Sequence, residues 1–214
     1  MKRVWDVPVR LFHWLLVVAF GFSWWSAETD HMDWHQRSGL ALCGLILFRL
    51  IWGFVGGSTA RFGQFVKGPG AVLASIRGKT EWRGVGHNPL GGWSSLVLIA
   101  LIAVQVTAGL FAVDIDGIES GPLSHFVDFD TGRVAADIHG INFNLLLGLA
   151  GLHSVAIFYY LVIKRRNLIW PMISGVDAQG EIEDALVPAP LWRLGLTIVA
   201  AGVLVWWIAG GLRV

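Results

Sequence analysis

The segment 137–166, DIHGINFNLLLGLAGLHSVAIFYYLVIKRR, is a long apolar stretch that carries two histidines. It is long enough to cross a bilayer as a single helix. His139 and His153 are fourteen residues apart, which on a helix is roughly 21 Å along the axis and about 40° around it. An ionisable side chain inside a membrane is energetically costly. It therefore usually belongs to a functional site in which a second group pairs with it. We therefore expect partners for both imidazoles elsewhere in the chain.

The composition indicates a membrane protein built from helices. The chain is 55% hydrophobic and only 14% charged, whereas soluble domains carry about 25% charged residues. We expect five membrane-spanning helices, at about 9–27, 36–55, 92–113, 141–163 and 191–211. The fold class is therefore an all-α integral membrane protein. The single cysteine, Cys43, excludes an internal disulfide, a covalent CxxCH haem site and an iron–sulfur cluster on four thiolates.

The charged residues between the spans predict the orientation. Basic residues precede the first span, occupy the loop between the second and third, and follow the fourth: Lys2, Arg3, Arg10, Arg61, Lys67, Arg77, Lys79, Arg83, Lys164, Arg165 and Arg166. The opposite loops are acidic: Glu28, Asp30, Asp33, Asp114, Asp116, Glu119, Asp128, Asp130 and Asp137. Because cytoplasmic loops carry the excess of Lys and Arg, we expect a cytoplasmic N-terminus and, after five spans, an external C-terminus.

The connections between the spans are expected to be mostly irregular. In the inner loop, 56–90, a Lys-Gly-Pro-Gly turn at 67–70 predicts a short surface helix over 71–78. The outer loop, 114–138, is longer than a simple connection needs, and we expect it to cover the outer end of the spans. Residues 171–190 are expected to form a cytoplasmic linker to the last span.

Two further histidines match the first two by depth. His13 lies near the cytoplasmic end of the first span, and His35 lies at the external start of the second. The fourth span enters from outside, so that His139 is external and His153 lies deeper. Depth therefore pairs His13 with His153 and His35 with His139.

Two facing imidazoles at each of two depths suit a neutral macrocycle with two axial ligands, and haem is the cofactor of this kind. Bis-histidine ligation fills both axial positions of the iron and so favours electron transfer over oxygen binding. Gly39, one turn after His35, allows a flat ring to approach the helix backbone. Arg10, Arg37 and Arg49 are candidate partners of the haem propionates.

The other candidate residues have simpler interpretations. A single histidine in a membrane is often only a structural hydrogen-bonding group. His31, one turn before His35, is an alternative ligand but lies in an acidic loop. His87 and His125 lie in loops and are interpreted as structural, although His125 is placed to line an external substrate site. Cys43 is interpreted as a small packing residue.

An ordered set of motifs resembles a known family. The motifs WDVPVRLFHW, WHQRSGL, FRLIWGFVG and GHNPLGG precede the histidine pair in this order. Together they resemble the prokaryotic cytochrome b-561 family, in particular the branch related to the b-type cytochrome subunit of nickel–iron hydrogenases. The likeness covers about residues 4–170. It implies a four-helix bundle over 1–170 that binds two b-type haems, with these four iron ligands: His13, His35, His139 and His153. The additional helix at 191–214 departs from the four-helix pattern.

The leading functional prediction is a di-haem cytochrome of the bacterial inner membrane. It would pass electrons between a periplasmic partner, such as a cytochrome c, and the quinone pool, and no nucleic-acid partner is indicated. One alternative is superoxide oxidation coupled to ubiquinone reduction, with Arg37 and Arg133 attracting the anion. A second is a membrane anchor and electron relay for a hydrogenase-like complex. A third is a haem-free transporter with metal bound at the histidines, although two ligands at each level are fewer than zinc prefers.

Overall fold

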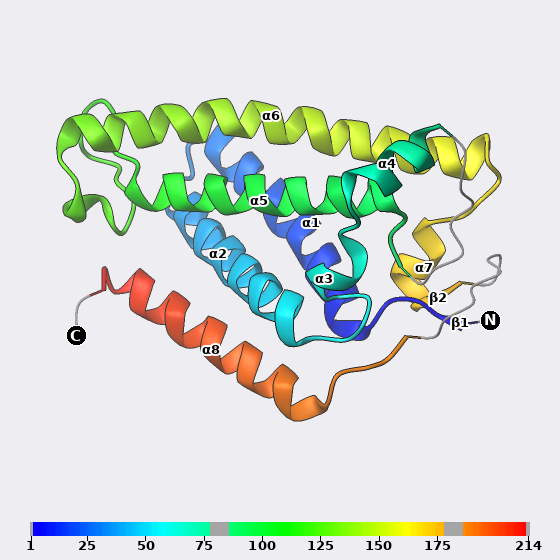
Figure 1. Cartoon of the computed structure of the whole chain (residues 1–214). Coiled ribbons are helices and arrows are strands. Elements are labelled where there is room, and N and C mark those ends of the chain that lie inside the picture. The colour runs from blue at the N-terminus through cyan, green and yellow to red at the C-terminus, as the bar shows by residue number, and fades with distance from the viewer. Residues whose placement is uncertain (1, 78–85, 178–185, 213–214) are drawn as a thin grey trace. The chain divides into compact units, whose positions relative to one another are not determined.

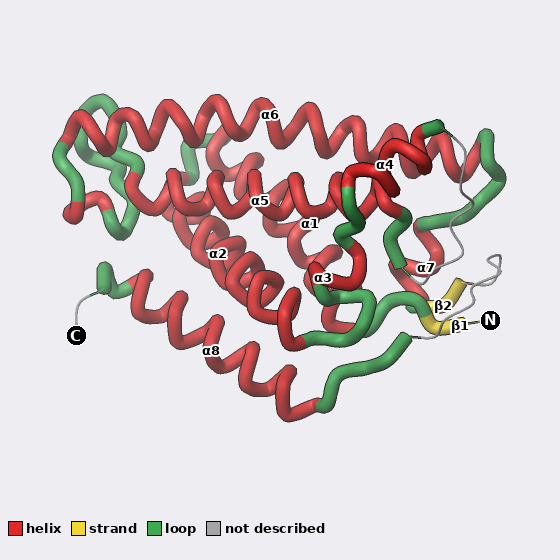
Figure 2. Tube along the Cα trace, viewed as in Figure 1, coloured by secondary structure: helices red, strands yellow, loops and turns green. Residues whose placement is uncertain are grey.

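The computed structural model of the protein describes residues 2–77, 86–177 and 186–212. Helices dominate these ranges (Figure 2). Five of them are long and apolar enough to cross a membrane: α1 (Val7–Glu28), α2 (Met32–Val55), α5 (Pro89–Phe111), α6 (Phe129–Val162) and α8 (Leu191–Ala209) (Figure 1). The predicted all-α integral membrane fold with five spans is therefore confirmed.

The remaining elements are short. The loop between α2 and α5 contains α3 (Phe62–Phe65) and α4 (Pro69–Ile76), of which only α4 was expected. A 3₁₀ turn, η1 (Ser124–Phe126), precedes α6, and α7 (Ile169–Ser174) follows it. Strands β1 (Lys2–Arg3) and β2 (Val176–Asp177) form one antiparallel pair. The expected end of the surface helix at Gly78, the basic residues Lys79 and Arg83, and residues 178–185 of the expected linker lie outside the described residues.

The expectation that 114–138 is entirely loop is wrong, because α6 begins at Phe129. Asp128 starts this helix: its Oδ1 accepts a hydrogen bond from the backbone N–H of Thr131 at 2.7 Å, as an N-capping residue does. That bond also lowers the pKa of the exposed Asp128 carboxyl. The first turns carry Asp130, Arg133 and Asp137, whose polarity hides the helix from a search for apolar runs. With 34 residues, α6 is roughly 51 Å long and exceeds the hydrocarbon core.

The chain forms two compact units, and each of the five long helices is divided between them. The first unit contains Met1–Phe12, Arg49–Leu98 and Leu149–Thr197. The second contains His13–Phe48, Ile99–Gly148 and Ile198–Val214. We describe each unit by itself.

In the first unit, the N-terminal segment is fastened to the segment after α6. β1 pairs with β2, and the backbone N–H of Val4 donates to Gly175 O at 2.8 Å. Gly175 has φ 83° and ends α7 in the left-handed conformation that glycine adopts without strain. A guanidinium N–H of Arg10 donates to Ile173 O. The segment before α1 and the segment after α6 are thus held together by these hydrogen bonds.

Asp6 joins α1 to α2 in the same unit. Its Oδ1 accepts a hydrogen bond from the Val9 backbone N–H at 2.8 Å, and its Oδ2 accepts one from Trp52 Nε1 at 3.2 Å. A Cβ on Gly57 would lie 2.9 Å from Asp6 Oδ2, so the approach of the chain after α2 requires glycine there. The motifs around Asp6 and Trp52, far apart in sequence, therefore form one structural junction.

The GHNPLGG motif builds the start of α5. Asn88 Oδ1 accepts a hydrogen bond from the Gly91 backbone N–H at 2.6 Å, which caps the helix. Pro89 is the first helical residue, a position where its missing N–H costs nothing. A Cβ on Gly92 would lie 2.6 Å from Phe65 O. This motif is thus explained by helix capping and by close backbone packing.

In the second unit, α8 packs on α2. A Cβ on Gly44 would lie 3.3 Å from Val205 Cγ2, which shows the close approach of the two helices. In the same unit, the backbone N–H groups of Gly121 and Leu123 donate to Ala112 O and Leu110 O at 2.8 and 2.9 Å. The loop after α5 therefore folds back on the end of that helix.

Candidate haem site

Two of the predicted histidines face one another in the second unit. His35 lies in the first turns of α2, and His139 lies within α6. Their ring centroids are 5.9 Å apart and the ring planes are nearly perpendicular, at 84°. Both side chains are half-buried. The two histidines that were paired by depth therefore lie next to each other, and their role as haem ligands stays a prediction.

A main-chain carbonyl holds each ring. His35 Nδ1 lies 2.9 Å from Ser23 O and 3.2 Å from Ser23 Oγ, both on α1. His139 Nδ1 lies 2.9 Å from Gln105 O on α5. Because a carbonyl oxygen only accepts hydrogen bonds, Nδ1 must carry the proton in both rings. In the neutral imidazole, Nε2 then keeps the lone pair that binds a metal.

This arrangement fits a haem iron. Metal-binding histidines generally donate their other ring N–H to a carbonyl or carboxylate, which fixes the ring and raises its basicity. Two imidazoles that share one metal, with metal–nitrogen bonds of about 2 Å, have centroids about 6 Å apart, close to the spacing of His35 and His139. No group of three or more His, Cys, Asp or Glu able to hold a metal occurs in the part of the chain that the structure describes. The pair therefore suits a macrocycle with two axial ligands better than a protein-only metal site.

Two glycines shape the surroundings of the pair. A Cβ on Gly109 would lie 2.9 Å from His139 Cε1 and 3.0 Å from its Nδ1, so only glycine leaves room for this ring against α5. Gly39, the candidate one turn after His35, has no atom within 4 Å of where its Cβ would be. Its expected role next to a flat ring stays a prediction.

The other two predicted ligands lie in different units. His13 belongs to the second unit and is half-buried, with its ring edge-on to Trp14 at 4.9 Å. His153 belongs to the first unit and is also half-buried. Their pairing stays a prediction from their depth in the sequence.

The three candidate arginines have different environments. Arg10 is half-buried and donates to Ile173 O. Arg37 is exposed, and its guanidinium lies 5.2 Å from the centroid of Trp34. Arg49 is buried at 3% exposure, and its Nη1 makes no hydrogen bond within the described residues. Arg10 Nε and Arg49 Nη1 are both buried without a hydrogen-bond acceptor among the described residues, and Arg49 is the more buried of the two residues.

The remaining histidines make contacts that agree with structural roles. His31 is exposed, stacks on Trp25 at 5.6 Å and contacts Thr29 Oγ1 at 3.0 Å. His87 contacts Ser95 Oγ at 2.8 Å in the first unit. His125 packs on Phe126 and close to Gly211 in the second. Cys43 is buried, as expected for a packing residue.

Four residues around the pair were missed by sequence reasoning: Ser23, Gln105, Gly109 and Asn142. Gln105 and Asn142 are polar residues inside apolar spans, which is a signal that the sequence offered. Ser23 and Gly109 offered none, because small residues are common in membrane helices.

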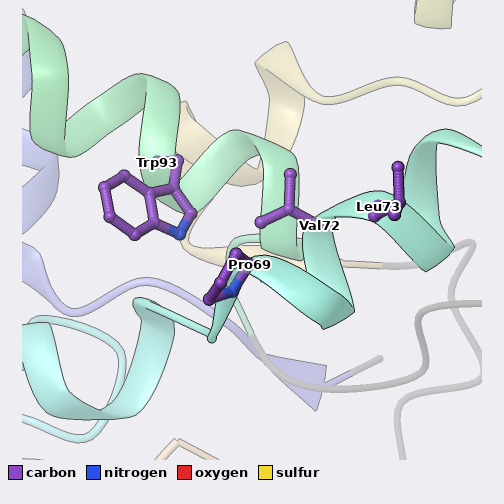
Figure 3. Close-up of a pocket in the computed structure, with 4 residues that line it drawn as sticks. All are labelled: Pro69, Val72, Leu73 and Trp93. Carbon is purple, nitrogen blue, oxygen red and sulfur yellow. The ribbon is translucent and has the colours of Figure 1, made fainter.

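A separate surface pocket lies in the first unit. It has a volume of about 410 Å³ and is lined by Pro69, Val72 and Leu73 of α4 and by Trp93 of α5 (Figure 3). Trp93 Nε1 donates to Lys67 O at 2.7 Å, which fixes the indole against the start of α4. The pocket is apolar and contains none of the predicted site residues.

The fold and the site define a class: a multi-pass helical membrane protein with a close pair of half-buried histidines on two of its helices. The family model for prokaryotic cytochrome b561 matches residues 4–175, and the chain belongs to this family. It is therefore a b-type cytochrome of the membrane, which binds haem b and transfers electrons. No curated protein and no solved structure matches the chain. The family match ends before α8, so the fifth span is additional to the family pattern.

Proposed function

We propose that the protein is a di-haem cytochrome that transfers electrons between a periplasmic redox partner and the quinone pool. The observation that supports this most is the pair His35 and His139, whose Nδ1 atoms both face main-chain carbonyls. In this proposal the two Nε2 atoms would bind the iron of an outer haem. The haem supplies a one-electron couple, and the protein fixes its ligands and surrounds it with apolar side chains.

The inner haem in this proposal is bound by His13 and His153. The support is the interval of fourteen residues between His139 and His153 on the continuous helix α6, which is roughly 21 Å. Two haems at this interval would provide a path for electrons across much of the hydrocarbon core. Arg49 would pair with a propionate of the inner haem, because it is buried and its Nη1 has no hydrogen-bond acceptor among the described residues. Arg10 already donates to Ile173 O, and Arg37 is exposed, so both are weaker candidates.

The proposed location is the bacterial inner membrane, with the N-terminus in the cytoplasm and the C-terminus in the periplasm. The excess of basic residues between α2 and α5 and after α6 supports this orientation. Acidic residues between α5 and α6 then face the periplasm and would attract a basic cytochrome c by electrostatic steering. An alkaline phosphatase fusion after Val214 should be active, and an inactive fusion would contradict the five-span orientation.

The first experiment is haem quantification with oxidised and reduced absorption spectra of the purified protein. Two low-spin b haems per chain are expected, and His139→Ala and His153→Ala should each lose one of them. Retention of both haems in either variant would reject the proposed ligand pairs. Two further assays then distinguish the candidate functions. Oxidation of the reduced protein by a soluble quinone tests the link to the quinone pool. Reduction of the oxidised protein by cytochrome c supports the leading function, reduction by superoxide supports superoxide oxidation, and reduction by neither supports an anchor subunit.

A further inference from the structure

A buried pair of amide side chains lies next to His139. Asn142 follows His139 by three residues on α6, so the two side chains point to the same side of the helix. Asn142 Nδ2 donates to Gln105 Oε1 at 2.7 Å and to Leu101 O at 3.0 Å, both on α5. Gln105 is 8% exposed and Asn142 is 6% exposed.

Burial of these amides is expensive in an apolar surrounding, and the hydrogen bonds that Asn142 donates to Gln105 and Leu101 offset this cost. The bonds also connect α5 to α6 at the level where His139 Nδ1 reaches Gln105 O. Gln105 therefore has two roles: its main-chain carbonyl accepts from the imidazole, and its side chain accepts from Asn142. A shift of α5 along α6 would break both contacts together.

We propose that Asn142 and Gln105 are positioning residues that set the His139 Nδ1–H···O=C hydrogen bond and, through it, the reduction potential of the outer haem. This inference depends on the proposed function, because it takes His139 as an iron ligand. A stronger hydrogen bond at Nδ1 makes the imidazole more basic. A more basic ligand favours ferric iron and lowers the potential, and hydrogen bonding of this kind is one of the means by which a protein tunes haem.

The test compares two asparagines on the same helix. Asn142→Leu removes the contacts to α5, whereas Asn144→Leu removes an exposed amide that donates only to Gly140 O of its own helix. For Asn142→Leu we expect the outer haem to favour the reduced state about tenfold more, an increase of about 59 mV for one electron. The inner haem in that variant, and both haems in Asn144→Leu, should keep their potentials in an optical redox titration. An unchanged outer potential in Asn142→Leu would overturn the proposal.

A second variant covers the case in which Asn142→Leu loses the outer haem. Gln105→Met has a similar volume, keeps the main-chain carbonyl and removes only the acceptor of Asn142. A raised outer potential in Gln105→Met supports the proposal, whereas an unchanged potential or a lost haem overturns it. The underlying function is tested separately by His139→Ala. If that variant retains both haems, the proposed ligands are wrong, and if it loses one while Asn142→Leu is unchanged, only the positioning role fails.

Discussion

The carbonyl oxygen of Gln105 lies 2.9 Å from Nδ1 of His139, so a main-chain group of α5 fixes the tautomer of an imidazole on α6. The same relationship exists between Ser23 of α1 and His35 of α2. Four helices thus contribute to one pair of imidazoles, two with the rings and two with the carbonyls. In the proposed haem site, these carbonyls would orient the iron ligands without binding the iron themselves.

Gly109→Ala tests how closely α5 must approach His139. The new Cβ would lie 2.9 Å from the Cε1 of the ring, closer than real Cβ contacts, so the ring must move away from Gln105 O. We expect haem content to fall from two towards one per chain, measured by pyridine haemochrome. Gly140→Ala is the control, because its Cβ would meet no atom within 4 Å. Two fully retained haems in Gly109→Ala would show that this contact is not needed.

The sequence predicted the spans and the histidines because both depend on local pattern. Runs of about twenty apolar residues identify helices in any membrane protein, and fourteen-residue spacing places His139 and His153 near one face. The carbonyl partners of the rings could not be predicted, because every residue has a carbonyl and only the packing of helices selects Ser23 and Gln105. The pairing of β1 with β2 was missed for a similar reason: strands of two residues have no recognisable period.

The junction at Asp6 predicts a dependence of stability on pH. Burial raises the pKa of the Asp6 carboxyl above its ordinary value of 3.8, although hydrogen bonds from Val9 and Trp52 and the charge of Arg49 oppose the effect. The folded state therefore binds this proton more tightly than the unfolded state. The stabilisation that comes from the protonated Asp6 carboxyl is full below the ordinary pKa and is lost as pH rises through the raised pKa.

Asp6→Asn should remove this dependence. The melting temperatures of the wild-type protein and the variant are measured in detergent from about pH 4 to about pH 7. The melting temperature of the wild type relative to that of the variant should fall as the pH rises. Asp128→Asn is a control of opposite sign, since the backbone N–H of Thr131 lowers the pKa of Asp128. A difference for Asp6→Asn that does not vary with pH would contradict the assignment.

Arg49→Met tests whether the buried guanidinium acts on a haem. The Cζ atom of Arg49 lies 4.8 Å from the centroid of the Phe62 ring and 5.8 Å from that of the Phe65 ring. Its Nη1 makes no hydrogen bond among the described residues. A cation near a haem stabilises the reduced form, because reduction adds a negative charge. Two unit charges roughly 10 Å apart, at an effective dielectric constant of about 20, interact by on the order of 1–2 kcal/mol. The inner haem of Arg49→Met should therefore have a lower potential, whereas Arg37→Met, which changes an exposed arginine, should leave the inner haem unchanged. Equal potentials in Arg49→Met and the wild-type protein, with both haems present, would assign Arg49 a structural role beside Asp6 instead.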